Sequence, residues 1–398
     1  MNLLICPSWY PQYEGDSHGS FFQEQAALLA RGGYQVSVLI LTGEAQKLKT
    51  PRYRWQRIVK FAFWRTRGPQ LRRNEREGVE EVHLELPLAV EELYNFIDAP
   101  IPTMYLQAGI RKYLRSSIPP DLVHAHSALN GGFVARAVSL QVGVPFVVTE
   151  HLSSYQTGSL SASHLERARK VFERSSEVIC VSRSLEASLQ RCGVLNRRAK
   201  VVPNFVDCER FGPNFFKTES RKEVLCIAAG KPGKGLAVLV EAFGIALRQS
   251  EWVLSIVGKP GKETGRIEQL IRDNDLEGKV NLLGPKPREQ VSSIIEEASF
   301  VVVSSTFETF GVTVIEALAM GKPVLSTRCG GPEEILDARN GLLVDSGSRE
   351  AMAKGLSWMA EHHGEYDPEE LRKDCCKRFG GPAVLLELGK VYESLTIG

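Results

Sequence analysis

Short apolar runs alternate with longer helical patterns along most of the chain, an alternation typical of parallel α/β folds. In the first half we predict strands at Leu3–Cys6, Gln35–Leu41, Leu122–His126, Pro145–Thr149 and Glu177–Val181. In the second half we predict strands at Val224–Ala228, Trp252–Val257, Lys279–Leu283, Phe300–Ser304 and Pro323–Ser326. Five strands are enough for one doubly wound sheet. The pattern therefore predicts an α/β protein of two Rossmann-like domains.

Helix-length patterns fill most of the gaps between these strands. They cover Ser20–Arg31, Gly132–Gln141, Leu236–Gln249, Arg288–Ala298 and Val312–Met320. Pro and Gly interrupt the pattern at Pro203–Asp207 and again at Phe211–Pro213, which marks a linker. We therefore expect one domain over 1–205 and a second over 206–379, a division that suits a chain of 398 residues.

Composition narrows the class of protein. Hydrophobic residues make up 43% and charged residues 24%, as in globular proteins, and the longest apolar runs fall short of the roughly 18 residues that a membrane helix needs. The N-terminus lacks a basic region like that of a signal peptide, so we expect a cytoplasmic protein. The eight cysteines show neither C-x-x-C pairs nor metal-ligand spacing, and we expect reduced thiols and no metal site.

Positive charge is concentrated between Lys47 and Arg73, where ten Lys and Arg occur with no acidic residue. Trp55, Phe61, Phe63 and Trp64 lie among them. The segment reads either as a basic amphipathic helix on an anionic lipid surface or as a solvated helix that packs its aromatics on the domain. The first interpretation predicts peripheral attachment to a membrane, and both stay open.

The stretch from Phe300 to Val324 carries the clearest chemistry. It reads as a buried strand, a tight loop, a helix that opens near Phe310, a Gly stop and a further strand. Free amides and the positive dipole end at the start of that helix suit a diphosphate. Glu308 in the loop and Glu316 along the helix are hydrogen-bond acceptors that could meet the hydroxyl groups of an extended ligand.

Glu308 and Glu316, within F-E-T-F-G-V-T-V-I-E-A-L-A-M-G-K-P-V, resemble the E-x7-E segment of the family 4 retaining glycosyltransferases, which have the GT-B fold. The resemblance implies that Glu308 contacts the transferred sugar and that Glu316 holds the ribose hydroxyls of a nucleotide-sugar donor. It also implies that the backbone at Phe310, Gly311 and Val312 meets the sugar and the phosphates.

Further motifs extend the resemblance over nearly the whole chain. The segment Leu122 to His126 and the segment Thr149 to His151 resemble two histidine positions of the family, which places His126 beside the reacting sugar and His151 on the acceptor side. The segments Pro7–Pro11 and His18–Gln23 resemble the loop that faces donor and acceptor. Ser20 and Gln23 form a capping-box pattern there, which puts Gly19 just before a helix.

The loop after the first strand of the second half departs from the family pattern. Lys234 with Gly235 matches the family's Lys-Gly, but Lys231 stands where an Arg is usual and the spacing is shorter. Lys234 is the expected diphosphate-binding cation, with Lys231 as a second candidate. The family's last helix returns to the first domain, so we expect residues 380–398 to pack there.

The resemblance implies transfer of a sugar from a nucleotide diphosphate donor to a sugar or lipid-linked acceptor, with retained anomeric configuration. The implied pathway is synthesis of polysaccharide or glycolipid. The nucleotide sugar is a substrate in it, so we expect no cofactor. The resemblance also implies that no metal is required, and we expect no nucleic-acid partner. A nucleotide-sugar epimerase of the same fold and a non-catalytic sugar-binding protein stay open. A nicotinamide oxidoreductase is disfavoured because neither half has G-x-G-x-x-G after its first strand.

Overall fold

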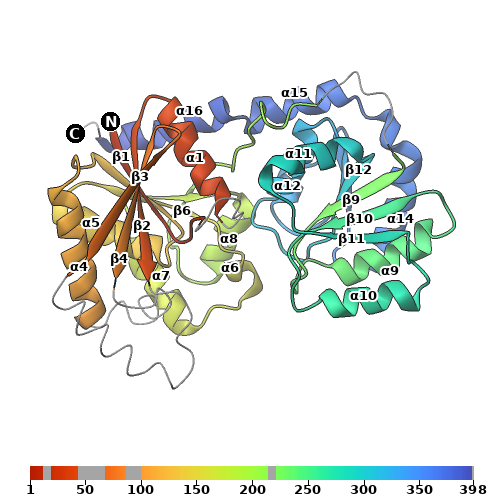
Figure 1. The fold of residues 1–398 in the computed structure, drawn as a ribbon, viewed down its shortest axis with the longest axis horizontal. Coiled ribbons are helices and arrows are strands. Elements are labelled where there is room, and N and C mark those ends of the chain that lie inside the picture. Colours follow the sequence, from red (N-terminus) through yellow and green to blue (C-terminus); the bar gives the residue numbers. More distant parts are fainter. Residues whose placement is uncertain (12–18, 44–67, 87–99, 214–220, 397–398) are drawn as a thin grey trace.

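The computed structural model describes residues 1–11, 19–43, 68–86, 100–213 and 221–396. They form two lobes that lie side by side, each built on one sheet (Figure 1). The predicted α/β architecture of two Rossmann-like domains is confirmed. Among the described helices, none combines the length and apolar character needed to cross a bilayer.

The first lobe holds an eight-stranded sheet of order β3-β4-β2-β1-β5-β6-β7-β8. Its strands are β1 (Asn2–Pro7), β2 (Gln35–Gly43), β3 (Gln70–Arg76), β4 (Val79–Leu86), β5 (Leu122–His126), β6 (Phe146–Glu150), β7 (Glu177–Cys180) and β8 (Lys200–Val201). Its helices are α1 (Ser20–Arg31), α4 (Pro100–Arg115), α5 (Gly131–Val142), α6 (Ser154–Thr157), α7 (Ala162–Arg174) and α8 (Arg183–Arg191). Neighbouring strands are parallel except β3 and β4.

The second lobe holds a parallel six-stranded sheet of order β11-β10-β9-β12-β13-β14. Its strands are β9 (Glu223–Ile227), β10 (Val253–Val257), β11 (Val280–Gly284), β12 (Phe300–Val303), β13 (Val324–Thr327) and β14 (Gly341–Val344). Its helices are α9 (Leu236–Leu247), α10 (Thr264–Asp273), α11 (Arg288–Glu297), α12 (Val312–Ala319), α13 (Pro332–Ile335), α14 (Arg349–His362), the short 3-10 helix η2 (His363–Glu365) and α15 (Pro368–Phe379).

Helices cover both faces of the second sheet. Alternate side chains of β12 point to opposite faces, as in any strand. Phe300 and Val302 pack with α9 and α14, whereas Val301 and Val303 pack with α11, α12 and α15. Burial on both faces explains why this strand is a continuous apolar run rather than an alternating one.

Four of the strands that the structure describes were not predicted from the sequence. They are β3, β4, β8 and β14. β3 is an exposed edge strand of sequence QLRRNER, which offers no apolar face to read. It pairs antiparallel with β4, and Arg73 of β3 forms an ion pair with Glu80 of β4.

The basic segment Lys47–Arg73 lies mostly outside the described residues. Its last residues, Gln70–Arg73, belong to β3, so the helical interpretation is wrong for that end. Attachment to an anionic lipid surface stays a prediction.

The chain crosses between the lobes twice, and the two crossings touch. The first crossing follows β8, and the second joins α15 to α16 (Gly381–Thr396), where the amide of Val206 donates to the carbonyl of Phe379 (2.8 Å). Figure 1 shows the last helices running from the second lobe back over the first. Val384, Leu388 and Tyr392 of α16 are buried in the core of the first lobe.

A disulfide joins these crossings. Cys208 of the first crossing is bonded to Cys376 of α15. The expectation that all the cysteines are reduced is therefore wrong for this pair, which are brought together by the fold from 168 residues apart. The remaining six cysteines are free thiols.

Candidate active site

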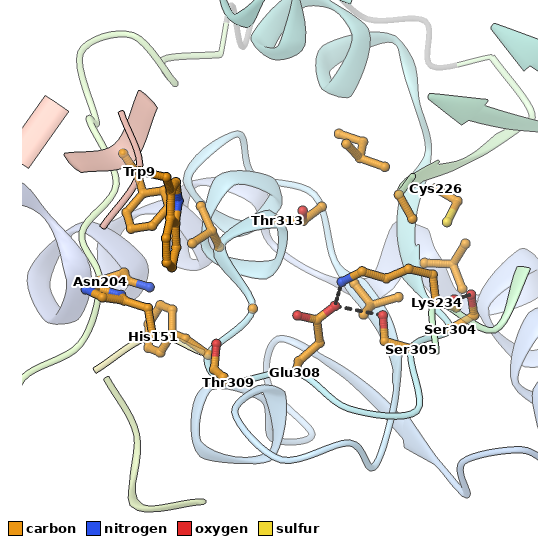
Figure 2. A pocket seen from close by; sticks show the side chains of 18 residues that line it. Trp9, His151, Asn204, Cys226, Lys234, Ser304, Ser305, Glu308, Thr309 and Thr313 are labelled. Atoms are coloured by element: carbon orange, nitrogen blue, oxygen red, sulfur yellow. Dashed lines mark hydrogen bonds and ion pairs between the residues drawn. The ribbon is translucent and has the colours of Figure 1, made fainter. Parts of the chain in front are cut away.

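A pocket lies where the strand order of the second sheet reverses, between β9 and β12. In open α/β sheets the carboxyl ends of the strands at this switch point leave a crevice for ligands. The second lobe lines the pocket with Cys226–Ala228, Val302–Ser305 and Glu308–Thr313, together with Lys234. The first lobe contributes Trp9, Phe21, His151 and Asn204. In Figure 2 Trp9, His151 and Asn204 face Lys234, Glu308 and Ser305 across the pocket.

Lys234 and Glu308 form an ion pair at the pocket wall. The Lys234 ammonium lies 2.6 Å from Oε1 of Glu308, and the same oxygen accepts a hydrogen bond from the Ser305 hydroxyl (2.7 Å) (Figure 2). Both side chains are partly exposed, at 33% for Lys234 and 21% for Glu308. The pair therefore presents one cation and one carboxylate to any ligand in the pocket.

The position of Lys234 depends on the glycine that follows it. Gly235 has φ +65°, and a Cβ atom there would lie 1.9 Å from the carbonyl oxygen of Ser304. In return, the Ser304 hydroxyl donates to the Lys234 carbonyl (2.8 Å). Only glycine allows the backbone of this loop to press against the end of β12.

Helix α12 begins at the pocket. Its N-cap is Gly311, at φ +103°, and the first-turn residues Val312 and Thr313 line the pocket with it. The first amides of a helix have no acceptor within the helix and carry a partial positive charge. The pocket thus combines the Lys234 ammonium with a helix N-terminus, two features that suit a phosphate group.

The loop before α12 is fixed from both lobes. Within the second lobe, the amide of Glu308 donates to the carbonyl of Cys329 (2.8 Å). From the first lobe, Gln156 Nε2 donates to the carbonyl of Glu308 (3.1 Å), and the Ser182 hydroxyl donates to the carbonyl of Thr309 (2.6 Å). The residues that carry the chemistry therefore lie in the contact between the lobes.

Three buried histidines stand on the first-lobe side of the pocket. Nδ1 of His126 lies 3.1 Å from Nε2 of His151, and His124 contacts the hydroxyls of Tyr392 and Thr149 at 2.7 Å each. Burial lowers the pKa of His124 and of His151 to about 3. Burial lowers the pKa of His126 as well, with its two histidine neighbours adding to the effect. The cluster is therefore neutral near pH 7.

The structure brings together six of the predicted site residues. Lys234, Glu308, Phe310, Gly311, Val312 and His151 line one pocket. Four others lie outside that lining: His126 is fully buried beside His151, Lys231 is exposed, Gly19 caps α1 and Glu316 is buried in α12. The expected capping box is wrong, because the N-cap of α1 is Gly19 itself, with no side-chain cap.

Several pocket residues were not singled out from the sequence. They include Phe21, Asn204, Cys226, Ser304, Ser305, Thr309 and Thr313. Cys226, Ser304 and Ser305 stand at or just beyond the ends of β9 and β12. The position of polar residues at the ends of predicted parallel strands was the signal that could have found them.

Family comparisons cover most of the chain. The sequence model described as Glycosyltransferase Family 4 matches residues 19–210, and the one described as Glycosyl transferases group 1 matches residues 209–378. The chain belongs to the family 4 glycosyltransferases. TuaC of Bacillus subtilis (strain 168), named for teichuronic acid biosynthesis, is 29% identical over 388 residues, 93% of this chain and 91% of TuaC. The glycosyltransferase MJ1178 of Methanocaldococcus jannaschii is 29% identical over 69% of this chain and 76% of its own.

Solved glycosyltransferases share the fold of this family 4 enzyme. A sucrose-phosphate synthase from Thermosynechococcus elongatus matches with a TM-score of 0.77 at 19% identity, over 99% of this chain and 98% of its own. Anabaena HepE in complex with UDP matches with a TM-score of 0.73 at 18% identity, over 99% and 100%. The architecture is GT-B, with two Rossmann-like lobes on either side of a cleft.

The histidine cluster predicts a loss of stability at acid pH. A histidine whose pKa is lowered on folding binds fewer protons in the folded state than in the unfolded state. Its contribution is complete above about pH 6.5, the unfolded pKa, and is lost as pH falls below that value. The glycosyltransferase should therefore take up protons on unfolding between pH 6.5 and 5.

Urea unfolding across this range, compared between wild type and His126→Gln, measures that uptake. On unfolding, the variant should take up about one proton fewer than wild type. Its free energy of unfolding should therefore decrease less steeply as the pH is lowered. Buried carboxyls with a raised pKa, such as Glu150, act in the opposite direction but are common to both proteins. His362→Gln, at a partly exposed position outside the cluster, serves as control. Equal slopes for wild type and His126→Gln would refute a neutral cluster.

Proposed function

We propose that this glycosyltransferase transfers a sugar from a nucleoside diphosphate donor to an acceptor hydroxyl, with retention of anomeric configuration and without a metal ion. The observation that carries the proposal is the Lys234–Glu308 pair at the N-terminus of α12. One cation and a helix N-terminus suit the diphosphate, and one carboxylate beside them suits the hydroxyls of the sugar.

In this proposal the donor phosphates replace Glu308 as the partner of Lys234. Lys234 and the first amides of α12 then stabilise the negative charge that develops on the leaving phosphate. Glu308, released from Lys234, accepts hydrogen bonds from the transferred sugar. Because Lys234 and the amides of α12 supply the positive charge at the phosphates, we expect the reaction to need no metal ion.

The acceptor enters from the first lobe, beside Trp9, His151 and Asn204. The bond from the anomeric carbon to the phosphate oxygen breaks, and a bond from that carbon to the acceptor oxygen forms on the same face. The acceptor proton goes to the leaving phosphate oxygen. A neutral His151 is consistent with this route, because the leaving phosphate rather than the imidazole takes the proton.

The naming of TuaC supports a place in synthesis of cell-surface polysaccharide or glycolipid. A polymer-building enzyme of this kind takes a sugar or a lipid-linked sugar as acceptor. Trp9 and Phe21 offer apolar surface to a sugar ring on that side of the pocket.

The stereochemistry of the product tests the proposal. The purified protein is screened for donors by thermal shift with a panel of nucleotide sugars, and the best donor is incubated with candidate acceptors in the presence of a chelator. We expect a product with the donor's anomeric configuration by proton NMR, formed at an undiminished rate in chelator. An inverted product or a rate abolished by chelator would contradict the mechanism, and an altered donor sugar without acceptor would indicate an epimerase.

The two lysines of the loop after β9 give a matched pair for the diphosphate role. Lys234→Ala should weaken binding of nucleotide sugar and nucleoside diphosphate about 10- to 100-fold, because a charge-assisted hydrogen bond is lost, while binding of the nucleoside stays unchanged. Lys231 is exposed and lies outside the pocket lining. Lys231→Ala should therefore bind nucleotide sugar, nucleoside diphosphate and nucleoside with affinities near those of wild type. Calorimetry that finds equal losses for nucleoside and nucleoside diphosphate in Lys234→Ala would exclude Lys234 as the phosphate cation.

A further inference from the structure

Glu316 is a charged residue within an apolar helix. The other buried residues of α12 are Val314, Ile315, Ala317, Leu318 and Ala319. Only 4% of the Glu316 side chain is exposed. A carboxylate in such surroundings becomes protonated unless a partner stabilises its charge.

Arg288 is that partner. It is the first residue of α11, and its Nη1 donates to Oε1 of Glu316. The same guanidinium lies over the ring of Phe211, with 5.0 Å between the guanidinium carbon and the ring centroid. Its own exposure is 20%, so solvent screens the ion pair only weakly.

Arg288 also reaches the first lobe. Its Nε and Nη2 donate to the two carboxylate oxygens of Glu24 in α1, at 2.9 and 3.3 Å. Arg210, in the crossing between the lobes, donates to Glu24 as well (2.7 Å). Charges of alternating sign thus run from Arg210 through Glu24 and Arg288 to Glu316, across the lobe contact.

We propose that Arg288 is a positioning residue for donor binding: it holds Glu316 ionised and oriented, so that the carboxylate can accept hydrogen bonds from the donor ribose. The proposal rests on the proposed function and on the role that the family resemblance implies for Glu316, which is to hold the ribose hydroxyls of the donor. Arg288 joins Glu316 through a single oxygen, which leaves the carboxylate capacity for further hydrogen bonds.

Among the charged groups near Glu316, Arg288 has the largest stabilising effect on the ionised carboxylate. Burial raises the pKa of Glu316 and Arg288 opposes that rise, whereas Glu24 raises the pKa further and Arg210 contributes a smaller opposing effect. From α15, Arg372 donates to the carbonyls of Phe211, Ala319 and Cys208, and the Cys375 thiol donates to the carbonyl of Ile315. From α13, Glu334 accepts hydrogen bonds from two amides of α8, and Glu333 accepts one from Gly330.

Removal of the Arg288 charge should make donor binding depend on pH. Burial and Glu24 would then raise the pKa of Glu316, opposed only by Arg210. Once protonated, Glu316 would lose acceptor capacity toward the ribose. Since the protonated fraction falls as pH rises, affinity should recover toward high pH. Arg288→Met removes the charge and keeps an apolar stem, and Arg288→Lys keeps a charge.

The test is calorimetry of the full chain from pH 6.5 to 8.5 with the tightest-binding of UDP, GDP and ADP. At pH 6.5 Arg288→Met should bind roughly tenfold or more weakly than wild type, the loss of a hydrogen bond to a charged group, and the ratio should shrink as pH rises. Arg288→Lys should follow the wild-type profile more closely. The exposed Arg248→Met, which loses only a pair with Asp275, is the matched control and should bind as wild type.

A constant ratio of Arg288→Met to wild type at every pH would indicate a merely structural role and overturn the proposal. Glu316→Gln tests it independently of whether Arg288→Met folds: it should bind weakly at every pH, and wild-type affinity would overturn the proposal. In the double variant Arg288→Met with Glu316→Gln, the effect of Arg288 on binding should disappear. If wild type binds none of the three nucleotides, the proposed function itself fails.

Discussion

The backbone of the loop between β12 and α12 is the constraint on which the rest of the site depends. Both lobes hydrogen-bond to this loop: Gln156 and Ser182 donate to it from the first lobe, and the carbonyl of Cys329 accepts its Glu308 amide in the second. Because the loop ends at the N-cap Gly311, fixing it also fixes where the amides of α12 point. The placement of the site is thus set by the contact between the lobes.

Electrostatics follow from this placement in two ways. At the pocket, Lys234 and Glu308 satisfy one another, so an arriving phosphate can exchange with a carboxylate instead of meeting a bare charge. Behind the pocket, Glu316 takes its partner from α11, and that partner extends to Glu24 in the first lobe. Lys234 and Glu308 both belong to the second lobe, whereas the pair of Arg288 with Glu24 forms across the contact between the lobes.

Sequence reasoning succeeded where burial leaves a plain pattern. The strand at Phe300–Val303 and the helices at Ser20–Arg31 and Val312–Ala319 are strongly apolar or periodic, and they were placed within a residue or two. Edge strand β3 has few apolar residues and was missed. The disulfide of Cys208 with Cys376 joins residues 168 apart in the chain, and the pair of Glu24 with Arg288 joins residues 264 apart. No local spacing reports such contacts.

Within the site, the family motif placed Lys234, Glu308 and Gly311 at one pocket, but the motif could not show what each side chain touches.

The central claim is that a nucleoside diphosphate lies at the start of α12, between the two sheets. A crystal structure of the protein with the nucleoside diphosphate that binds it most tightly tests this most directly. The account predicts phosphate oxygens within hydrogen-bond distance of the amides at Val312 and Thr313 and of the Lys234 ammonium. A nucleotide bound elsewhere, with the Lys234–Glu308 pair intact, would contradict it.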